Sequence, residues 1–315
     1  MLHPQLVVLL ERAASSPLPP YHDVPPAVAR RFYRDTRAPL TPDPPPVESV
    51  QLLLAPGKGG PVPLRAYRPK GAGKDEVLPA LIYIHGGGWV IGDLDTHDVV
   101  CRTLANGARC AVFSVEYRKA PESPFPAALD DCFSALQFVS ENSKKLNVNP
   151  SKIAVGGDSA GGNLAAAVTL KARDSGGPWL AFQCLLYPVL DCTCDTPSYA
   201  EFAEGFGLTR AKMEFFGRSY LGRGDATDPF ISPLRAVDLS GLPPALVITA
   251  EYDVLRDEGE AYARRLTVSG VPVESWQVEG VIHAFIHYAG VIQRGQSVLR
   301  EVAEKLRRAL GGQRS

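Results

Sequence analysis

The sequence lacks any long apolar run and any excess of charge of one sign. Its N-terminal segment, MLHPQLVVLLERAA, holds only the short run LVVLL, with no Lys or Arg before it. That run is too short to span a bilayer and lacks the basic start of a signal peptide. Lys and Arg (33) nearly balance Asp and Glu (34), and no basic run is interleaved with aromatic residues. We therefore expect no membrane span and no nucleic-acid partner.

Cysteine is also scarce, with six residues in a chain of 315. Because no export signal is evident, we expect reduced thiols and a cytoplasmic location. Cys192 and Cys194 are separated by one residue, but neither a second close cysteine pair nor a nearby histidine completes a zinc site. We interpret these two as small residues of a loop and expect no metal.

The composition is typical of a large globular domain. Hydrophobic residues make up 45% of the chain and charged residues 21%, which provides a sizeable core. The length suits an α/β domain that carries a lid. Ten prolines between residues 15 and 46 exclude regular strand pairing there, although Pro26 can begin a short helix in PAVARRFYRDTR. Residues 1–48 are therefore predicted to form an arm that contributes to a cap over the domain at 49–315.

From residue 50 onward, apolar runs of strand length alternate with helical stretches. The first two runs, 50–55 and 62–69, have no helix between them and predict an antiparallel pair at one edge. Later strands are expected at 80–85, 110–117, 152–157, 184–190, 245–251 and 273–278, and helices at 97–108, 126–146, 160–174, 257–268 and 296–310. This alternation predicts a mostly parallel, doubly wound sheet of eight strands.

A long insertion interrupts this alternation after residue 190. Its part at about 191–225 is too apolar for a solvated linker, so we expect helices that pack over the sheet edge as a cap. The aromatic residues of this insertion predict an apolar pocket: Phe202, Phe206, Phe215, Phe216 and Tyr220. The strand at 273–278 is a candidate edge strand through which a homodimer could form.

Residues 157–161, Gly-Asp-Ser-Ala-Gly, match the pattern G-x-S-x-G between a strand and an Ala-rich helix. A strand-to-helix turn sharp enough to lift the Ser159 hydroxyl out of the backbone leaves no room for larger neighbours. Such a serine is a candidate nucleophile. The alternative is a helix N-cap, a common role for serine at this kind of junction.

A nucleophilic serine needs a base and an orienting carboxylate, which on this fold follow it in the order Ser, Asp or Glu, His. Only two of the six histidines, His283 and His287, come after Ser159. His283 follows a strand closely and is the first choice, with His287 as the fallback. Asp253 lies just past the strand at 245–251 and is the preferred carboxylate, with competitors Asp257 and Glu251.

The segment HGGGWVIG at 85–92 follows the third strand, where donors for a developing oxyanion belong. Consecutive glycines leave backbone N–H groups uncovered, so we expect Gly86 and Gly87 to act with Ala160 as an oxyanion hole. A phosphate-binding loop is the rival interpretation, but neither G-x-x-x-x-G-K-[ST] nor G-x-G-x-x-G with its acidic residue is present.

Taken together, the motifs resemble those of the hormone-sensitive-lipase-like family of α/β-hydrolase carboxylesterases, from about residue 50 to the C-terminus. The resemblance implies a nucleophile at Ser159, a base at His283, a carboxylate at Asp253, the α/β-hydrolase fold with a helical cap, and no cofactor. The segments that carry it are HGGGWVIGDLDTHD, EYRKAPESPFPAALDD, GDSAGGNLAAA, DPFISPL, EYDVLRDEGEAYARRL and HAF.

The resemblance implies a serine carboxylesterase that acts on small-molecule esters with short to medium acyl chains. Val254 stands where the family often has Pro, and Ala284 where it often has Gly. Two alternatives stay open. One is hydrolysis of amides or lactones, and the other is an inert binding module, as in the gibberellin receptors of plants. Those receptors characteristically lack the catalytic histidine, whereas His283 is present here.

Overall fold

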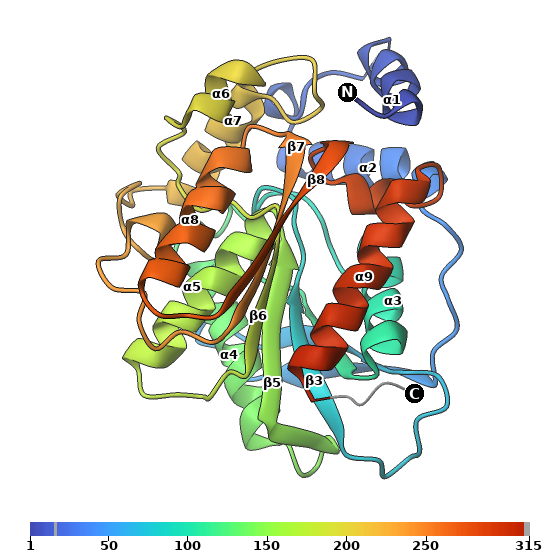
Figure 1. Cartoon of the computed structure of the whole chain (residues 1–315), viewed down its shortest axis with the longest axis vertical. Coiled ribbons are helices and arrows are strands. Elements are labelled where there is room, and N and C mark those ends of the chain that lie inside the picture. Colours follow the sequence, from blue (N-terminus) through green and yellow to red (C-terminus); the bar gives the residue numbers. More distant parts are fainter. Residues whose placement is uncertain (16–17, 312–315) are drawn as a thin grey trace.

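The computed structural model describes residues 1–15 and 18–311, within which eight strands form one twisted sheet (Figure 1). Its order is β1-β2-β4-β3-β5-β6-β7-β8, and from β4 to β8 all neighbouring strands are parallel. The pair β1–β2 is antiparallel, as is β2–β4. The strands are β1 (Ser49–Ala55), β2 (Val62–Arg68), β3 (Leu78–Ile84), β4 (Ala111–Val115), β5 (Val148–Asp158), β6 (Phe182–Leu186), β7 (Ala245–Tyr252) and β8 (Val273–Ile282). The predicted α/β fold with its mostly parallel eight-stranded sheet is confirmed.

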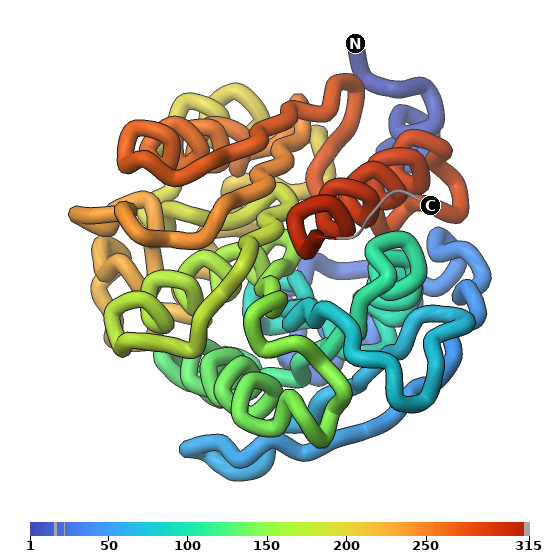
Figure 2. The backbone as a smooth tube through the Cα atoms, turned by 60° about the horizontal axis from the view of Figure 1, so that its bottom comes forward, coloured from blue at the N-terminus to red at the C-terminus, as the bar shows by residue number. Residues whose placement is uncertain are grey.

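Helices cover both faces of the sheet (Figures 1 and 2). On one face lie α4 (Ala127–Glu141), α5 (Ala160–Asp174) and α8 (Arg256–Val268). On the other face α3 (Asp98–Ala108) and α9 (Gln293–Ala309) pack side by side. This arrangement is the doubly wound architecture that the strand and helix alternation predicts.

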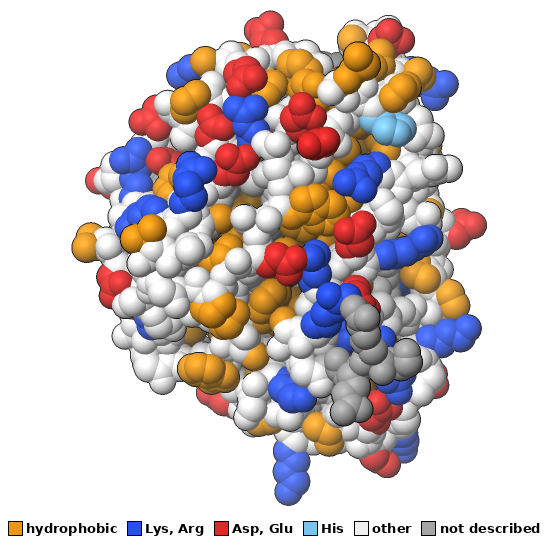
Figure 3. Space-filling view, viewed as in Figure 1, with side chains coloured by type: hydrophobic (Ala, Val, Ile, Leu, Met, Phe, Trp, Pro, Cys, Tyr) orange, Lys and Arg blue, Asp and Glu red, His pale blue; other side chains and the backbone are white. Residues whose placement is uncertain are grey.

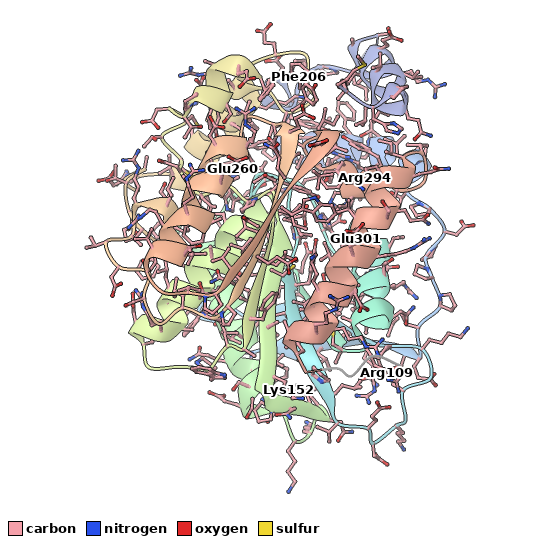
Figure 4. The ribbon with its side chains drawn as sticks, in the orientation of Figure 1. Arg109, Lys152, Phe206, Glu260, Arg294 and Glu301 are labelled. Atoms are coloured by element: carbon pink, nitrogen blue, oxygen red, sulfur yellow. The ribbon has the colours of Figure 1, made fainter. Side chains whose placement is uncertain are left out.

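The central strands face two cores because side chains alternate across a strand. In β3, Ile82 and Ile84 point to one core, and Leu81 and Tyr83 point to the other. The helices provide the matching apolar surfaces. On α9 the buried residues recur with helical spacing, while Glu301 lies exposed on the opposite side (Figure 4).

Two segments far apart in the sequence lie together at the carboxyl ends of the strands (Figure 1). The first holds α1 (Pro4–Ala14), the 3-10 turn η1 (Tyr21–Asp23), α2 (Pro26–Arg37) and η2 (Ala38–Leu40). The second holds α6 (Pro197–Glu201) and α7 (Arg210–Leu221). Figure 4 shows Phe206, between α6 and α7, at the end of the molecule opposite to Lys152 and Arg109.

The N-terminal segment holds more helix than predicted. The expected short helix begins at Pro26, as α2, but α1 was not foreseen. Leu6 is the fully buried residue of α1, and the backbone N–H of His3 bonds to the carbonyl oxygen of Gly280 at 2.9 Å. Tertiary docking therefore holds α1 in place. The helix predicted at 126–146 is shorter in the structure, where α4 ends at Glu141.

Further expectations from the sequence concern the cysteines, membrane spans, surface charge and the edge strand. All six cysteines are buried and unpaired. Within residues 1–15 and 18–311, no helix is long and apolar enough to cross a membrane. Acidic and basic side chains are interspersed over the face seen in Figure 3. The strand β8 is an edge strand, as expected, whereas the homodimer through it stays a prediction.

Burial of the central strands makes a stability prediction. Leu81 in β3 is 1% exposed, whereas Leu52 in the edge strand β1 is 73% exposed. Leu81→Ala should lower the free energy of unfolding by about 2–5 kcal/mol, because it leaves a cavity. Leu52→Ala is the matched control and should change it by less than about 0.5 kcal/mol. Urea unfolding of both variants measures the difference, and equal losses would contradict this assignment of the core.

Candidate active site

Ser159 occupies a strained turn between β5 and α5. Its φ of 57° and ψ of −122° lie outside the ordinary regions for a residue with a side chain. The turn brings the chain against the end of β3, since a Cβ on Gly161 would lie 2.0 Å from the carbonyl oxygen of Ile84, and one on Gly157 would lie 2.4 Å from the same atom. The Ser159 side chain makes no capping hydrogen bond to α5, although the residue stands at the N-cap position. Its hydroxyl is therefore available for another partner.

That partner is His283, and a carboxylate lies behind it. His283 Nε2 is 2.9 Å from Ser159 Oγ, and His283 Nδ1 is 2.7 Å from Asp253 Oδ2. The other carboxylate oxygen of Asp253 accepts the backbone N–H of Leu255 at 3.0 Å, which orients the group. Asp253 is 1% exposed, and Ser159 and His283 are each 8% exposed. The three side chains form one continuous hydrogen-bonded chain that is nearly closed to solvent.

The competing residues are engaged elsewhere. Asp257 accepts the backbone N–H of Ser198 at 2.8 Å, and Glu251 accepts that of Gly280 at 2.6 Å. His287, the fallback base, belongs to a different hydrogen-bond network, with its Nε2 3.0 Å from Asp158 Oδ2. The structure therefore brings Ser159 together with His283 and Asp253, the histidine and the carboxylate preferred from their sequence positions.

An aromatic residue supports the His283 ring. The rings of Tyr187 and His283 meet edge to face with centroids 4.9 Å apart, and Phe285 contacts Tyr187 at 5.5 Å in the same manner. Tyr187 has a left-handed φ of 37°, and its N–H bonds to the carbonyl oxygen of Ile248 at 2.6 Å. Sequence reasoning missed this residue because nothing in its local sequence places it beside His283.

Asp158, the neighbour of Ser159, anchors a second buried network. Asp158 Oδ1 accepts the Tyr83 hydroxyl at 2.7 Å, while Oδ2 lies 3.0 Å from His287 Nε2. His97 Nε2 lies 3.3 Å from Oδ1. Burial opposes ionisation of Asp158, but His97 and His287 outweigh it and hold the pKa of Asp158 well below its usual range. Burial also lowers the pKa of His287 to about 4. Asp158 is therefore ionised at neutral pH, directly before Ser159 in the turn.

His97, Asp158 and His287 offer the ligand types of a metal centre, with their ligand atoms within 4.8 Å of one another. Hydrogen bonds already account for these atoms, because both Asp158 oxygens accept donors and His287 Nε2 faces one of them. We therefore interpret the cluster as a hydrogen-bond network. Two of its residues stand inside the motifs HGGGWVIGDLDTHD and GDSAGGNLAAA, but only the fold brings them to His287.

The glycine loop after β3 differs from expectation at one position. The Gly86 N–H donates to Asp158 Oδ1 at 3.1 Å and to His97 Nε2 at 3.2 Å, so it is held by the second network and is not free for a bound ligand. Within the described part of the chain, no hydrogen-bond acceptor is found for the N–H groups of Gly87 and Gly88. Their φ angles, 116° and 57°, are ones that glycine adopts without strain.

The loop is fixed from outside by the N-terminal arm. Arg30 of α2 donates through Nε to the carbonyl oxygen of Val90 at 2.8 Å and through Nη2 to that of Ala120 at 3.1 Å. Glu122 completes the contact with a bidentate ion pair to Arg30. The arm therefore holds the segment that follows the three glycines.

Aromatic side chains of the 191–225 insertion border the loop. Phe216 lies directly against Gly88, where a Cβ would fall 2.2 Å from its ring. Tyr220 stacks on Trp89 with ring centroids 4.3 Å apart. Farther along, Phe206 packs on Tyr252 at 5.3 Å, above the end of β7 (Figure 4). These contacts surround the glycine loop with apolar surface.

The depressed pKa of His287 makes a prediction about stability. Folded His287 stays neutral as the pH falls from 6.5 to about 4, while the unfolded chain takes up a proton in this range. The unfolded state then binds more protons, so stability is lost as the pH falls. His287→Gln keeps an N–H for Asp158 but cannot titrate, and should remove on the order of 3 kcal/mol of this loss. Urea unfolding at pH 7 and pH 4 measures it, and parallel losses in both proteins would contradict it.

Comparisons with known proteins agree with this geometry. The α/β-hydrolase fold family matches residues 81–287. The carboxylic ester hydrolase LipN of Mycobacterium tuberculosis is 45% identical over 245 residues, which are 76% of this chain and 64% of that protein, so the chain spans slightly less than two thirds of that relative. The ethyl acetate hydrolase of Pseudomonas putida is 36% identical over 319 aligned positions, covering 98% of this chain and 99% of that protein.

Solved structures extend the likeness to the whole fold. An ester hydrolase from the metagenome of Lake Arreo, in complex with a bipyridine phosphonate derivative, superposes with a TM-score of 0.95 at 41% identity. That superposition covers 99% of this chain and 100% of the other. The chain therefore belongs to the α/β-hydrolase fold family, in its group of hormone-sensitive-lipase-like carboxylesterases.

Proposed function

We propose that the protein is a serine carboxylesterase in which Ser159 is the nucleophile, His283 the general base and Asp253 the orienting carboxylate. The observation that carries this proposal is the hydrogen-bonded chain from Ser159 Oγ through both nitrogens of His283 to Asp253. This order and spacing are what an activated hydroxyl requires. The relatives named as ester hydrolases support the reaction class.

In the first step, Ser159 Oγ attacks the ester carbonyl carbon as its proton moves to His283 Nε2. Asp253 accepts the Nδ1–H of His283, which fixes the tautomer and stabilises the imidazolium that forms. The imidazolium then gives its Nε2 proton to the leaving alkoxide, the alcohol departs, and an acyl-Ser159 ester remains. Water attacks this ester by the same route, releasing the acid and restoring the serine hydroxyl.

The negative charge that develops on the carbonyl oxygen needs N–H donors. We propose Gly87 and Ala160, as expected from the sequence, together with Gly88 in place of Gly86. The Gly86 N–H is engaged by Asp158 and His97, whereas the Gly87 and Gly88 N–H groups have no acceptor in the described residues. Ala160 begins α5, so its N–H is one of the unsatisfied donors of a helix N-terminus.

The pocket is proposed to suit esters of short to medium acyl chains. Phe216, Tyr220 and Trp89 border the glycine loop with apolar surface, and the site is nearly closed. We further propose that residues 1–48 and about 191–225 form one cap on the domain at 49–315, because their helices lie together at the carboxyl ends of the strands (Figure 1). A cytoplasmic location and a homodimer through β8 stay predictions.

Substrate chain length and Ser159→Ala test the proposal together. The wild type should hydrolyse p-nitrophenyl acetate and butyrate faster than decanoate and palmitate, and Ser159→Ala should lose at least about a thousandfold in kcat. Initial rates of p-nitrophenol release measure both. A preference for palmitate would indicate a lipase. If no ester is turned over and a fluorophosphonate fails to label Ser159, the inert binding module becomes the better reading, whereas labelling without ester turnover would favour amides or lactones.

Asp158 should affect the rate without touching the substrate. Asp158→Ala removes the carboxylate that accepts from Tyr83, Gly86 and His287. The glycine loop loses its anchor, so kcat should fall about ten- to a hundredfold while KM changes little. Tyr83→Phe, which keeps the charge and removes one donor, is the control and should lose much less. A change confined to KM would contradict this role.

A further inference from the structure

Arg37, at the end of α2, is a charged residue without a counterion close to the proposed active site. The other three arginines of this helix lie near a carboxylate: Arg30 near Glu122, Arg31 near Asp35 and Arg34 near Asp93. In the described part of the chain, no carboxylate forms an ion pair with Arg37, and its Nη1 atom is buried without a hydrogen-bond partner.

Aromatic rings enclose the Arg37 guanidinium. Its central carbon lies 5.0 Å from the Tyr33 ring centroid and 4.6 Å from that of Tyr288. Burial would lower the pKa of Arg37, but Tyr288, Tyr33 and Tyr21 outweigh it and raise that pKa above its usual value. The side chain is therefore a permanent cation between aromatic rings, with the Nη1 amino group left without an acceptor in the described residues.

A second cation comes from α7, in the other segment of the proposed cap. Lys212 of α7 is half-buried, and its Nζ donates to a neutral acceptor, the carbonyl oxygen of Gly207, at 2.7 Å. Burial and the charge of Arg37 lower the pKa of Lys212. The 3-10 turn η1 packs against both α2 and α7, so the two cations lie on neighbouring elements. Two like charges in a partly buried place are unfavourable unless an anion joins them.

Both cations border the proposed catalytic centre. Arg37 contacts the ring of Tyr288, which ends the 3-10 turn η4 (Phe285–Tyr288) that begins two residues after His283. The ring of Tyr187 lies 4.9 Å from that of His283. Tyr187 adds a buried hydroxyl without a partner. On the other side, Gly207 lies against Ile282, the residue before His283. Their helices α2 and α7 lie at the same end of the molecule as the carboxyl ends of β7 and β8 (Figure 1).

We propose that Arg37 and Lys212 form an anion-recognition site at the proposed active site, and that esters carrying a carboxylate group are its preferred ligands. The proposal rests on the esterase function of Ser159 and names a substrate class for it. A planar carboxylate can pair with the free N–H of Arg37 while Lys212 supplies a second positive charge. Filling the site also removes the repulsion between the two cations.

Matched pairs of esters test the proposal. For a carboxylate on the acyl side, monomethyl glutarate is compared with methyl 5-methylhexanoate, in which an isopropyl group replaces the carboxylate. For the alcohol side, 3-acetoxypropionate is compared with isopentyl acetate. Acid release in a pH-stat gives kcat/KM for each ester, and the ratio of charged to neutral ester within one variant cancels any general change in activity.

The variants are Arg37→Met, Lys212→Met and the double substitution, with Arg31→Met as the control on the same helix. Arg31 is exposed and lies 4.0 Å from Asp35. For at least one ester pair, the ratio should fall about tenfold in each single variant and further in the double variant. The control should keep the wild-type ratio. Arg37→Lys, which retains a charge, should restore part of the preference, and added NaCl should weaken it in the wild type.

Different outcomes distinguish a failure of this proposal from a failure of the esterase function on which it rests. Turnover of the neutral esters with unchanged ratios in Arg37→Met and Lys212→Met would overturn the anion site and leave the esterase intact. If Arg37→Met does not fold, Lys212→Met and Arg37→Lys decide the same question. A wild type that hydrolyses neither ester of a pair, nor p-nitrophenyl butyrate, would overturn both proposals.

Discussion

The rest of the site depends on the close approach of the Ser159 turn to the end of β3. Gly157 and Gly161 both face the carbonyl oxygen of Ile84, at distances where no side chain fits. The turn that results forces a positive φ on Ser159 and leaves its hydroxyl uncapped. The packing of β5 and α5 on β3 sustains this strain, because residues 153–158 of β5 and 160–170 of α5 are all buried. The chain stores local strain where it gains a hydroxyl directed at His283.

Two buried aspartates serve this turn in different ways because their surroundings differ. Asp253 accepts His283 and one backbone N–H, so it orients the ring that contacts Ser159. Asp158 accepts Tyr83, Gly86 and His287, so it holds the glycine loop and the turn in register. The same carboxyl group is thus an orienting partner in one place and a structural anchor in the other. The two aspartates therefore have different roles because their hydrogen-bond partners differ, although the residue type is the same.

The N-terminal arm carries two arginines of α2 in different electrostatic surroundings. Arg30 has a carboxylate partner and two carbonyl acceptors, and it fixes the loop after the glycines. Arg37, two turns later on the same helix, has aromatic neighbours and a buried Nη1 atom without a hydrogen-bond partner in the described residues. One arginine therefore completes an ion pair, whereas the other holds an unpaired donor between the rings of Tyr33 and Tyr288. A helix that serves both purposes can shape the site and take part in recognition.

The sequence by itself determined the sheet and the order of its helices, and it pointed to His283 and Asp253, the two residues linked to Ser159, because apolar periodicity and the placement of motifs at strand ends are local signals. It did not determine α1, which tertiary docking of Leu6 holds in place, or the direction of the Gly86 N–H, which depends on Asp158 and His97. Nor could it bring Tyr187 to His283, or Arg37 to Tyr288. Those contacts join residues far apart in the chain, and only the packed fold sets such distances.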